Sequence, residues 1–212
     1  MAICRLAKLK MGTIFLSASV PVAGRGNYAD SADPFLIQCA VRELIIAIIR
    51  THKIVWGGHP AITPMVWNIC EYLGEDCKNS VILYQSDFFK GQFPIENDWF
   101  PNVVYTTQID GNMTMSLEQM RKDMLSRDDL VAAVFIGGME GVEAEHHMFK
   151  TLQPDALVLP VPSPGGAALE LARKEGYFSG DALIDVDFAR FFHDRLTKAI
   201  NSDVQGAAAS AP

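Results

Sequence analysis

The stretch from Val131 to Lys150, VAAVFIGGMEGVEAEHHMFK, constrains the fold more than any other part of the chain. Val131 to Ile136 is an apolar run rich in β-branched residues, which predicts a fully buried strand. Gly137 and Gly138 interrupt the run, and acidic, helix-compatible residues follow at once. A strand, a glycine turn and a helix start gather backbone N–H groups at the positive end of the helix dipole, the usual geometry for holding an anion.

The rest of the chain alternates between β-rich apolar segments and helix-like segments. Asp33-Pro34 is a typical helix start, with Asp as the cap and Pro in the first turn. Ser116 is the expected cap of another helix, LEQMRKDMLSR. Strands are expected at 13–19, 53–56, 81–84, 103–107, 131–136 and 156–161, with helices between them. This alternation predicts an α/β, Rossmann-like, doubly wound fold with a mainly parallel sheet and helices on both faces.

The 212 residues suffice for one sizeable domain, which we place at 11–202. Residues 1–10 are expected to be an N-terminal extension, with Met11 as a candidate start, and 203–212 a disordered tail. The apolar run after Lys8 and Lys10 resembles a signal peptide, but it is short and interrupted by serines, so we assign it to the first strand. No run reaches the ~18 apolar residues of a spanning helix, and we expect a cytoplasmic protein without a membrane partner.

Charge and metal-ligand patterns exclude several classes of function. A net charge of −7 argues against direct nucleic-acid binding by charge alone. The four cysteines form no CxxC pair, so reduced, mostly buried thiols are expected. The adjacent His146 and His147 would point about 100° apart on a helix, and HExxH is absent. We therefore expect neither a metal nor a cofactor.

Three turns follow predicted strands: SASVP, GGHPAITP and GGMEGVEAE. Ligands of doubly wound sheets bind at the carboxyl ends of strands, so these turns could converge on one crevice, although a Gly-Gly pair is also a common tight turn. We expect a side chain at Gly138 to block the ligand and leave the fold intact. The candidate ligand-binding residues are Ser17, Ser19, Gly57, Gly58, His59, Thr63, Gly137, Gly138, Met139, Glu140, Gly141 and Glu143.

Two groups of aromatic residues each have two interpretations. The long loop QSDFFKGQFPIENDWFP is either a packed loop or a stacking platform for a base. The final helix carries Phe188, Phe191, Phe192 and Leu196 on one face, which predicts either intramolecular packing or a subunit interface. Arg121, on the helix before the central strand, belongs either to a solvated face or to the crevice, where its guanidinium would grip a phosphate.

The pieces IFLSAS, VWGGHPAITP, MRKDM and FIGGMEGVEAE, in this order and spacing, resemble the LOG-type phosphoribohydrolases and the wider SLOG superfamily. LOG enzymes, once misnamed lysine decarboxylases, cleave the N-glycosidic bond of nucleoside monophosphates. They carry an Arg-Lys pair on a helix and a PGGxGTxxE turn, whose Arg and last Glu serve catalysis. By position these residues correspond to Arg121 and Glu145.

The chain departs from the LOG pattern at the phosphate-binding turn. Ile136 replaces the family Pro, Val142 replaces the Thr that holds phosphate, and His59-Pro60 stands where the family has glycine. The resemblance implies binding of a nucleotide-derived ligand, ADP-ribose-like or nucleoside-phosphate-like, as a sensor of the kind associated with bacterial anti-phage or stress systems. The alternative is an N-glycoside hydrolase that releases a base from a nucleotide. Homodimers or larger oligomers are typical of these relatives.

Overall fold

The computed structural model describes residues 12–200, in which six strands form one parallel sheet. The expected N-terminal extension, the candidate start at Met11 and the expected tail lie outside these residues. The strands are β1 (Thr13–Ser19), β2 (Lys53–Trp56), β3 (Val81–Ser86), β4 (Val103–Thr106), β5 (Leu130–Gly137) and β6 (Leu157–Val161). The helices are α1 (Tyr28–Ser31), α2 (Pro34–Ile48), α3 (Thr63–Leu73), α4 (Glu75–Asn79), α5 (Met113–Leu125), α6 (Glu140–Leu152), α7 (Gly166–Lys174) and α8 (Phe188–Phe192).

The strand order β4-β3-β2-β1-β5-β6 confirms the predicted doubly wound, Rossmann-like fold. The chain moves outwards from β1 to β4, then crosses back to place β5 on the other side of β1. Ser17 pairs in register with Phe135, and Ser19 with Gly137. The reversal of direction at β1 and β5 is the topological switch point, where the carboxyl ends of the strands leave room for a ligand.

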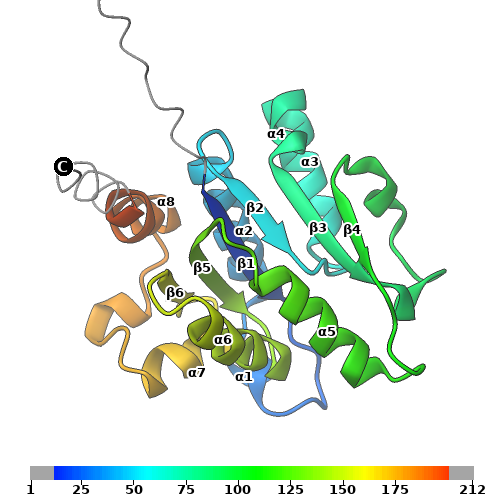
Figure 1. The fold of residues 1–212 in the computed structure, drawn as a ribbon. Coiled ribbons are helices and arrows are strands. Elements are labelled where there is room, and N and C mark those ends of the chain that lie inside the picture. Colours follow the sequence, from blue (N-terminus) through cyan, green and yellow to red (C-terminus); the bar gives the residue numbers. More distant parts are fainter. Residues whose placement is uncertain (1–11, 201–212) are drawn as a thin grey trace, which may run out of the picture.

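Helices cover both faces of the sheet (Figure 1). Because side chains alternate along a strand, Ile14 and Leu16 of β1 pack with α2, α3 and α8, whereas Phe15 packs with α5, α6 and α7. Figure 1 shows α5 and α6 in front of the sheet, with α2 and α3 behind it. Residues 17 and 19 of β1 therefore share the face of Phe15 and lie on the side of α6.

Local sequence explains where two of the helices begin. The Asp33 carboxylate accepts hydrogen bonds from Phe35 N and Leu36 N at 2.8 and 3.1 Å, which confirms the predicted cap of α2. The predicted cap of α5 is wrong. Asn112 is the cap, and its side chain accepts from Met115 N at 3.0 Å. Ser116 lies inside the first turn, where its hydroxyl donates to Asn112 O and accepts from Ile109 N.

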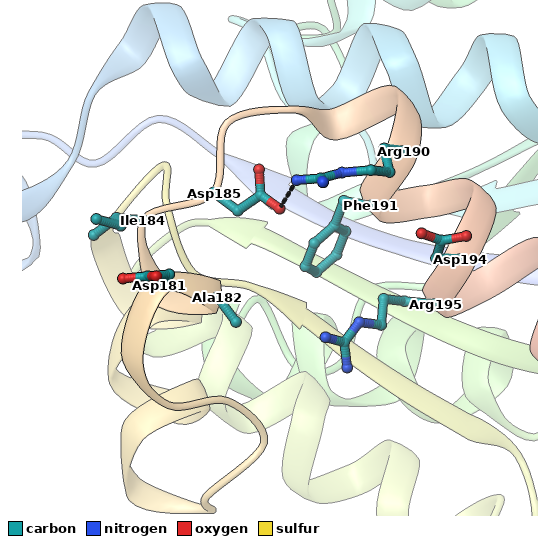
Figure 2. A pocket seen from close by; sticks show the side chains of 8 residues that line it. All are labelled: Asp181, Ala182, Ile184, Asp185, Arg190, Phe191, Asp194 and Arg195. Carbon is teal, nitrogen blue, oxygen red and sulfur yellow. Dashed lines mark hydrogen bonds and ion pairs between the residues drawn. The ribbon is translucent and has the colours of Figure 1, made fainter.

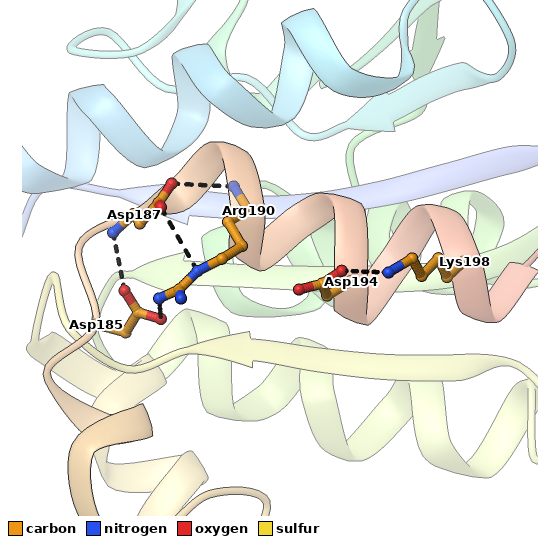
Figure 3. Close-up of polar contacts among 5 residues, drawn as sticks. All are labelled: Asp185, Asp187, Arg190, Asp194 and Lys198. Carbon is orange, nitrogen blue, oxygen red and sulfur yellow. Dashed lines mark hydrogen bonds and ion pairs between the residues drawn. The ribbon is translucent and has the colours of Figure 1, made fainter.

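The start of α8 is held by a cluster of charged residues (Figure 3). The Asp187 side chain accepts from Arg190 N, and the Arg190 guanidinium lies 2.9 Å from Asp185 and 3.5 Å from Asp187. One turn further on, Lys198 pairs with Asp194 at 2.7 Å. These contacts lie on the solvent side of the helix and leave its aromatic side for the core.

The aromatic stripe of the last helix packs within the molecule. Phe188, Phe191, Phe192 and Leu196 are all buried and belong to the same core cluster as the residues of α2. A π-helical turn at His193–Thr197 keeps Leu196 on this side. Of the two interpretations of the stripe, the structure favours intramolecular packing over a subunit interface.

Two further sequence predictions concern membrane contact and cysteines. Within residues 12–200, no helix has the length and apolar character needed to cross a membrane. Cys70 and Cys77 are buried and Cys39 is half-buried, all three as free thiols. Burial raises the pKa of the Cys70 thiol to about 12, so this thiol stays protonated and unreactive at neutral pH.

Candidate functional site

A cavity of about 530 Å³ lies at the carboxyl ends of the strands, at the switch point of the sheet. Residues from β1, β2, β3, α5 and α6 contribute to its wall. Each of the three predicted turns supplies part of it. Ten of the predicted site residues line it: Ser17, Ser19, Gly57, Gly58, His59, Thr63, Arg121, Met139, Gly141 and Glu145. The cavity is large enough for a small organic ligand.

The Glu145 carboxylate is the polar centre of this cavity. Ser17 Oγ donates a hydrogen bond to Glu145 Oε2 at 2.5 Å, and Arg121 Nε donates to Glu145 Oε1 at 3.1 Å. The Arg121 and Glu145 side chains are only 19% and 15% exposed, so solvent screens this ion pair less than a surface pair. Charge-assisted bonds of this kind are stronger than neutral ones and fix the orientation of the carboxylate.

The sequence places these three groups together for simple geometric reasons. Ser17 follows Phe15 by two residues on β1, so both face α6. Glu145 lies one helical turn after Val142, on the side of α6 that Val142 and Phe149 bury against the sheet. Arg121 follows the buried Met120 on α5, which packs beside α6.

A carboxylate held in this way can do two kinds of chemistry. Each carboxylate oxygen has two lone pairs, so Glu145 can accept a further hydrogen bond from a sugar hydroxyl in the cavity. It can also stabilise positive charge that develops on a ribosyl carbon, or take a proton from water. Both roles need a ligand whose sugar lies against α6.

The glycine turn after β5 leads into α6, whose start lines the cavity, whereas the predicted site residues Gly137 and Gly138 are not among the lining residues. Gly137 and Gly138 have positive φ angles of 63° and 78°, which glycine adopts readily. Gly138 N donates to Ser19 O at 2.8 Å, and Gly138 O accepts from Ala167 N at 2.9 Å. A Cβ on Gly138 would lie 2.1 Å from Val142 Cγ2. A side chain at Gly138 would thus strain the turn itself, and its effect on the fold stays a prediction.

The acidic residues of the first turn of α6 lie apart from the cavity centre. Glu140 forms an ion pair with Arg25, and both side chains are more than half exposed. Glu143 lies beside Tyr28, whose pKa is raised by burial and by the Glu143 carboxylate. Of this group, only Arg25 lines the cavity, and its guanidinium is paired with Glu140.

His59 and Thr63 hold the turn between β2 and α3. His59 N donates to Thr63 Oγ1 at 3.1 Å, and His59 Nδ1 accepts from Ala61 N at 3.2 Å. Burial lowers the pKa of His59, so its imidazole is neutral at pH 7. Gly58 has a φ of 70°, and a Cβ at this position would lie 2.2 Å from Gln85 Nε2. The absence of a side chain on Gly58 lets Gln85 Nε2 donate to Gly57 O at 2.9 Å.

The two adjacent histidines of α6 have different surroundings. His146 is buried, and its Nε2 lies 3.1 Å from Tyr177 Oη, whereas His147 is exposed. Burial lowers the pKa of His146, so it is neutral in the core at pH 7. In residues 12–200, no group of three or more His, Cys, Asp or Glu is placed to hold a metal ion.

Sequence reasoning missed part of the cavity wall. The missed residues are Arg25, Trp56, Gln85, Ser86 and Asn97. Phe89 and Phe93, which belong to the loop predicted to be either packed or a stacking platform, also line the cavity. That loop contains two short 3-10 helices, Asp87–Phe89 and Ile95–Trp99. Its end is packed, since the Trp99 ring lies 5.4 Å from that of Trp67. The unusual length of the loop suggested a functional role, but it did not single out Gln85, Ser86 or Asn97.

A second cavity, of about 470 Å³, lies between the 181–185 segment and α8 (Figure 2). Figure 2 shows Arg190 joined to Asp185 at its rim, with Arg195 on the other side. The Arg195 guanidinium lies over the Phe178 ring at 5.2 Å. This cavity lies outside the switch point of the sheet, so we place the site at the strand ends.

The fold and the cavity define a Rossmann-like protein with a ligand crevice at the switch point between β1 and β5. The SLOG cluster3 family matches residues 27–196, and the chain belongs to this family. The match begins after β1, so Ser17 and Ser19 precede the matched range.

The chain was also compared with curated proteins and with solved structures. No curated protein matches the chain. One similar solved structure is the X-ray structure of TM1055, a structural genomics target, with 14% identity and a TM-score of 0.49. That similarity covers 81% of this chain and 84% of TM1055.

Proposed function

We propose that this protein binds a nucleotide-derived ligand, ADP-ribose-like or nucleoside-phosphate-like, in the cavity at the switch point. Bound there, the ligand would act as the signal in a cytoplasmic bacterial anti-phage or stress system. The observation that carries the proposal is the Ser17–Glu145–Arg121 group, a fixed carboxylate facing a cavity at the strand ends. Membership of a SLOG family supports the nucleotide-related class.

The charges around the cavity suggest how such a ligand would lie. The N-terminus of α6 contributes Met139 and Gly141 to the wall, and a helix N-terminus favours an anion. Arg121 and Arg25 line the same region and would meet phosphate oxygens. A ribose next to the phosphate would place a hydroxyl against Glu145 Oε1 or Oε2.

Hydrolysis of an N-glycosidic bond is the second candidate function. It is favoured by the position of Glu145, which is the residue that corresponds to the catalytic Glu of the LOG enzymes and which faces the cavity. In this reaction Glu145 would stabilise the oxocarbenium-like ribosyl centre or activate water, with Arg121 orienting the substrate.

One experiment separates the two functions. The protein is incubated with a panel of nucleotides that includes AMP and ADP-ribose, and each mixture is measured by thermal shift and by chromatography of the products. A sensor raises its melting temperature and releases no base, whereas a hydrolase releases free base. If no nucleotide changes the melting temperature and no base appears, the proposal is wrong.

The variant Glu145→Gln tests the site. We expect it to lose base release if the protein is a hydrolase, because the amide cannot take a proton or carry the stabilising charge. Glu118→Gln, the same change on an exposed position of α5, is the matched control. Equal release of base by the wild type and Glu145→Gln would exclude Glu145 as the catalytic group.

A further inference from the structure

Three buried side-chain polar atoms in the part of the chain that the structure describes have no hydrogen-bond partner: Trp56 Nε1, Asn97 Nδ2 and Asn97 Oδ1. Buried polar groups are almost always paired, since each unpaired one costs about 1–3 kcal/mol. Both residues line the cavity at the strand ends. Their unpaired atoms are therefore an unexplained feature of the site itself.

The main chain around Asn97 is well held, so the unpaired amide is not the result of a loosely packed segment. Asn97 N donates to Pro94 O at 3.0 Å, and Asn97 O accepts from Phe100 N at 3.3 Å. The Trp67 ring contacts Trp99 and Phe100, with centroids 5.4 Å away in each case. Asn97 as a whole is 1% exposed and lines the cavity, so the cavity is the side from which a ligand would approach its amide.

Two aromatic rings of the loop that carries Asn97 also line the cavity. Phe89 and Phe93 line its wall, and the Phe93 ring packs against Tyr105 at 5.5 Å. Rings with this support offer a flat apolar surface to a planar group, and stacking of a base on an aromatic ring contributes about 1–3 kcal/mol. The planar group would thus be covered by rings and would present its edge to polar atoms.

We propose that Trp56 and Asn97 form a base-binding subsite for adenine in this cavity, an inference that rests on the proposed nucleotide ligand. An Asn amide pairs with adenine through two hydrogen bonds, accepting from N6–H and donating to N7. The same edge of guanine presents two acceptors, O6 and N7, and leaves the amide oxygen unpaired. The Trp56 indole N–H donates to another ring nitrogen, so the subsite has more donors than acceptors, which suits adenine.

The position of this subsite fits a ligand that extends along the strand ends. Asn97 and Phe93 follow β3, whereas Glu145 follows β5, and β1 and β2 lie between them. Three strand spacings amount to about 14 Å. A nucleotide with its phosphate near α6 and its ribose at Glu145 would direct its base along the sheet towards β3.

Calorimetry with four probes tests the subsite: AMP and ADP-ribose carry adenine, GMP carries guanine, and ribose 5-phosphate carries no base. For the wild type we expect AMP to bind at least tenfold more tightly than GMP or ribose 5-phosphate. Asn97→Leu, similar in shape but apolar, should weaken both adenine probes by roughly ten- to hundredfold and leave ribose 5-phosphate unchanged. Its melting temperature without ligand should not fall, because it removes two unpaired polar atoms.

Two controls keep the result interpretable. Asn68→Leu makes the same change on an exposed position of α3 and should alter no affinity. Trp56→Phe removes the indole N–H and keeps a ring, and it should show the same selective loss if Asn97→Leu does not fold.

The outcomes separate the subsite from the proposed function. If the wild type binds ribose 5-phosphate as tightly as AMP, or if Asn97→Leu keeps the wild-type affinity for AMP, the adenine subsite is overturned while nucleotide-related binding stands. A parallel loss of AMP and ribose 5-phosphate by a folded Asn97→Leu would also overturn it. If the wild type binds none of the four probes, both the subsite and the proposed function are overturned.

Discussion

Ser17 is the residue whose role depends most directly on a single contact. Its hydroxyl is buried and donates to Glu145, so Ser17→Ala leaves the carboxylate with Arg121 as its remaining side-chain donor. Loss of a hydrogen bond to a charged group costs about 1.5–3 kcal/mol. We expect the free energy of unfolding in urea to fall by that amount. Ser19→Ala, on the same strand and facing the same side, should change it by less than half as much.

Gly138 is limited by both its backbone and its surroundings. Gly138→Ala adds a Cβ at positive φ and 2.1 Å from Val142 Cγ2, whereas Gly176→Ala adds one at a φ of 70° with nothing within 4 Å. We expect Gly176→Ala to lower the free energy of unfolding by about 1 kcal/mol, from backbone strain alone. Gly138→Ala should cost at least 2 kcal/mol more. Equal costs in denaturant titrations would mean that Val142 moves aside freely.

At the scale of elements, two helix starts show when local sequence can predict the N-cap residue and when it cannot. The Asp33-Pro34 pair identified the start of α2 because both residue types favour that position. At α5 two capping residue types, Asn112 and Ser116, lie four residues apart, and propensity alone does not choose between them. The choice is made by the turn before the helix, where Asp110 and Gly111 have positive φ angles of 48° and 65°. Helix propensities do not describe this turn, so they could not predict which of the two residues is the cap.

The packing of α8 gives a prediction at the same scale. Phe192 is fully buried on α2, so Phe192→Ala should lower the free energy of unfolding by about 3–5 kcal/mol. Phe35→Ala is the matched control, because Phe35 lies on α2 with 70% of its surface exposed. Light scattering should give the same mass for the wild type and both variants. A folded Phe192→Ala of smaller mass would instead support the subunit-interface interpretation.

For the molecule as a whole, three histidines make the folded state less stable as the pH falls. Burial lowers the pKa values of His52, His59 and His146 below the ordinary 6.5. The unfolded chain therefore binds more protons than the folded one as pH falls through about 6.5, and the stability present above that pH is lost. We expect the urea midpoint to fall between pH 7.5 and pH 5.

A substitution isolates one of these histidines. His146 faces Tyr177, Lys150, Glu175, His147 and Lys174, and Gln at this position can keep a hydrogen bond to Tyr177 without titrating. The dependence on pH should become shallower in His146→Gln. A profile that is unchanged by this variant would place the acid sensitivity at the other two histidines.

The sequence predicted the architecture and ten of the 27 residues that line the cavity. Alternating strands and helices, and a glycine turn after the central strand, sufficed for the fold and for the wall formed by β1, β2, α5 and α6. Asn97 and Trp56 could not be predicted as part of the site. Asn97 precedes the glycine turn by 40 residues in the sequence. Only the strand order β3-β2-β1 brings its loop to the same edge of the sheet as that turn.

The glycine turn after β5 meets the start of α7 and the end of α1 through main-chain atoms, and this limits how the protein can be redesigned. A Cβ on Gly165 would lie 1.9 Å from Ser31 O, and one on Gly166 would lie 2.8 Å from the Gly137 carbonyl carbon. Three segments thus meet with no room for side chains between them. Attempts to retarget the protein to a new ligand will find little freedom there. Changes of ligand preference are better sought at side chains of the cavity wall, such as Phe89 and Phe93 in the loop between β3 and β4.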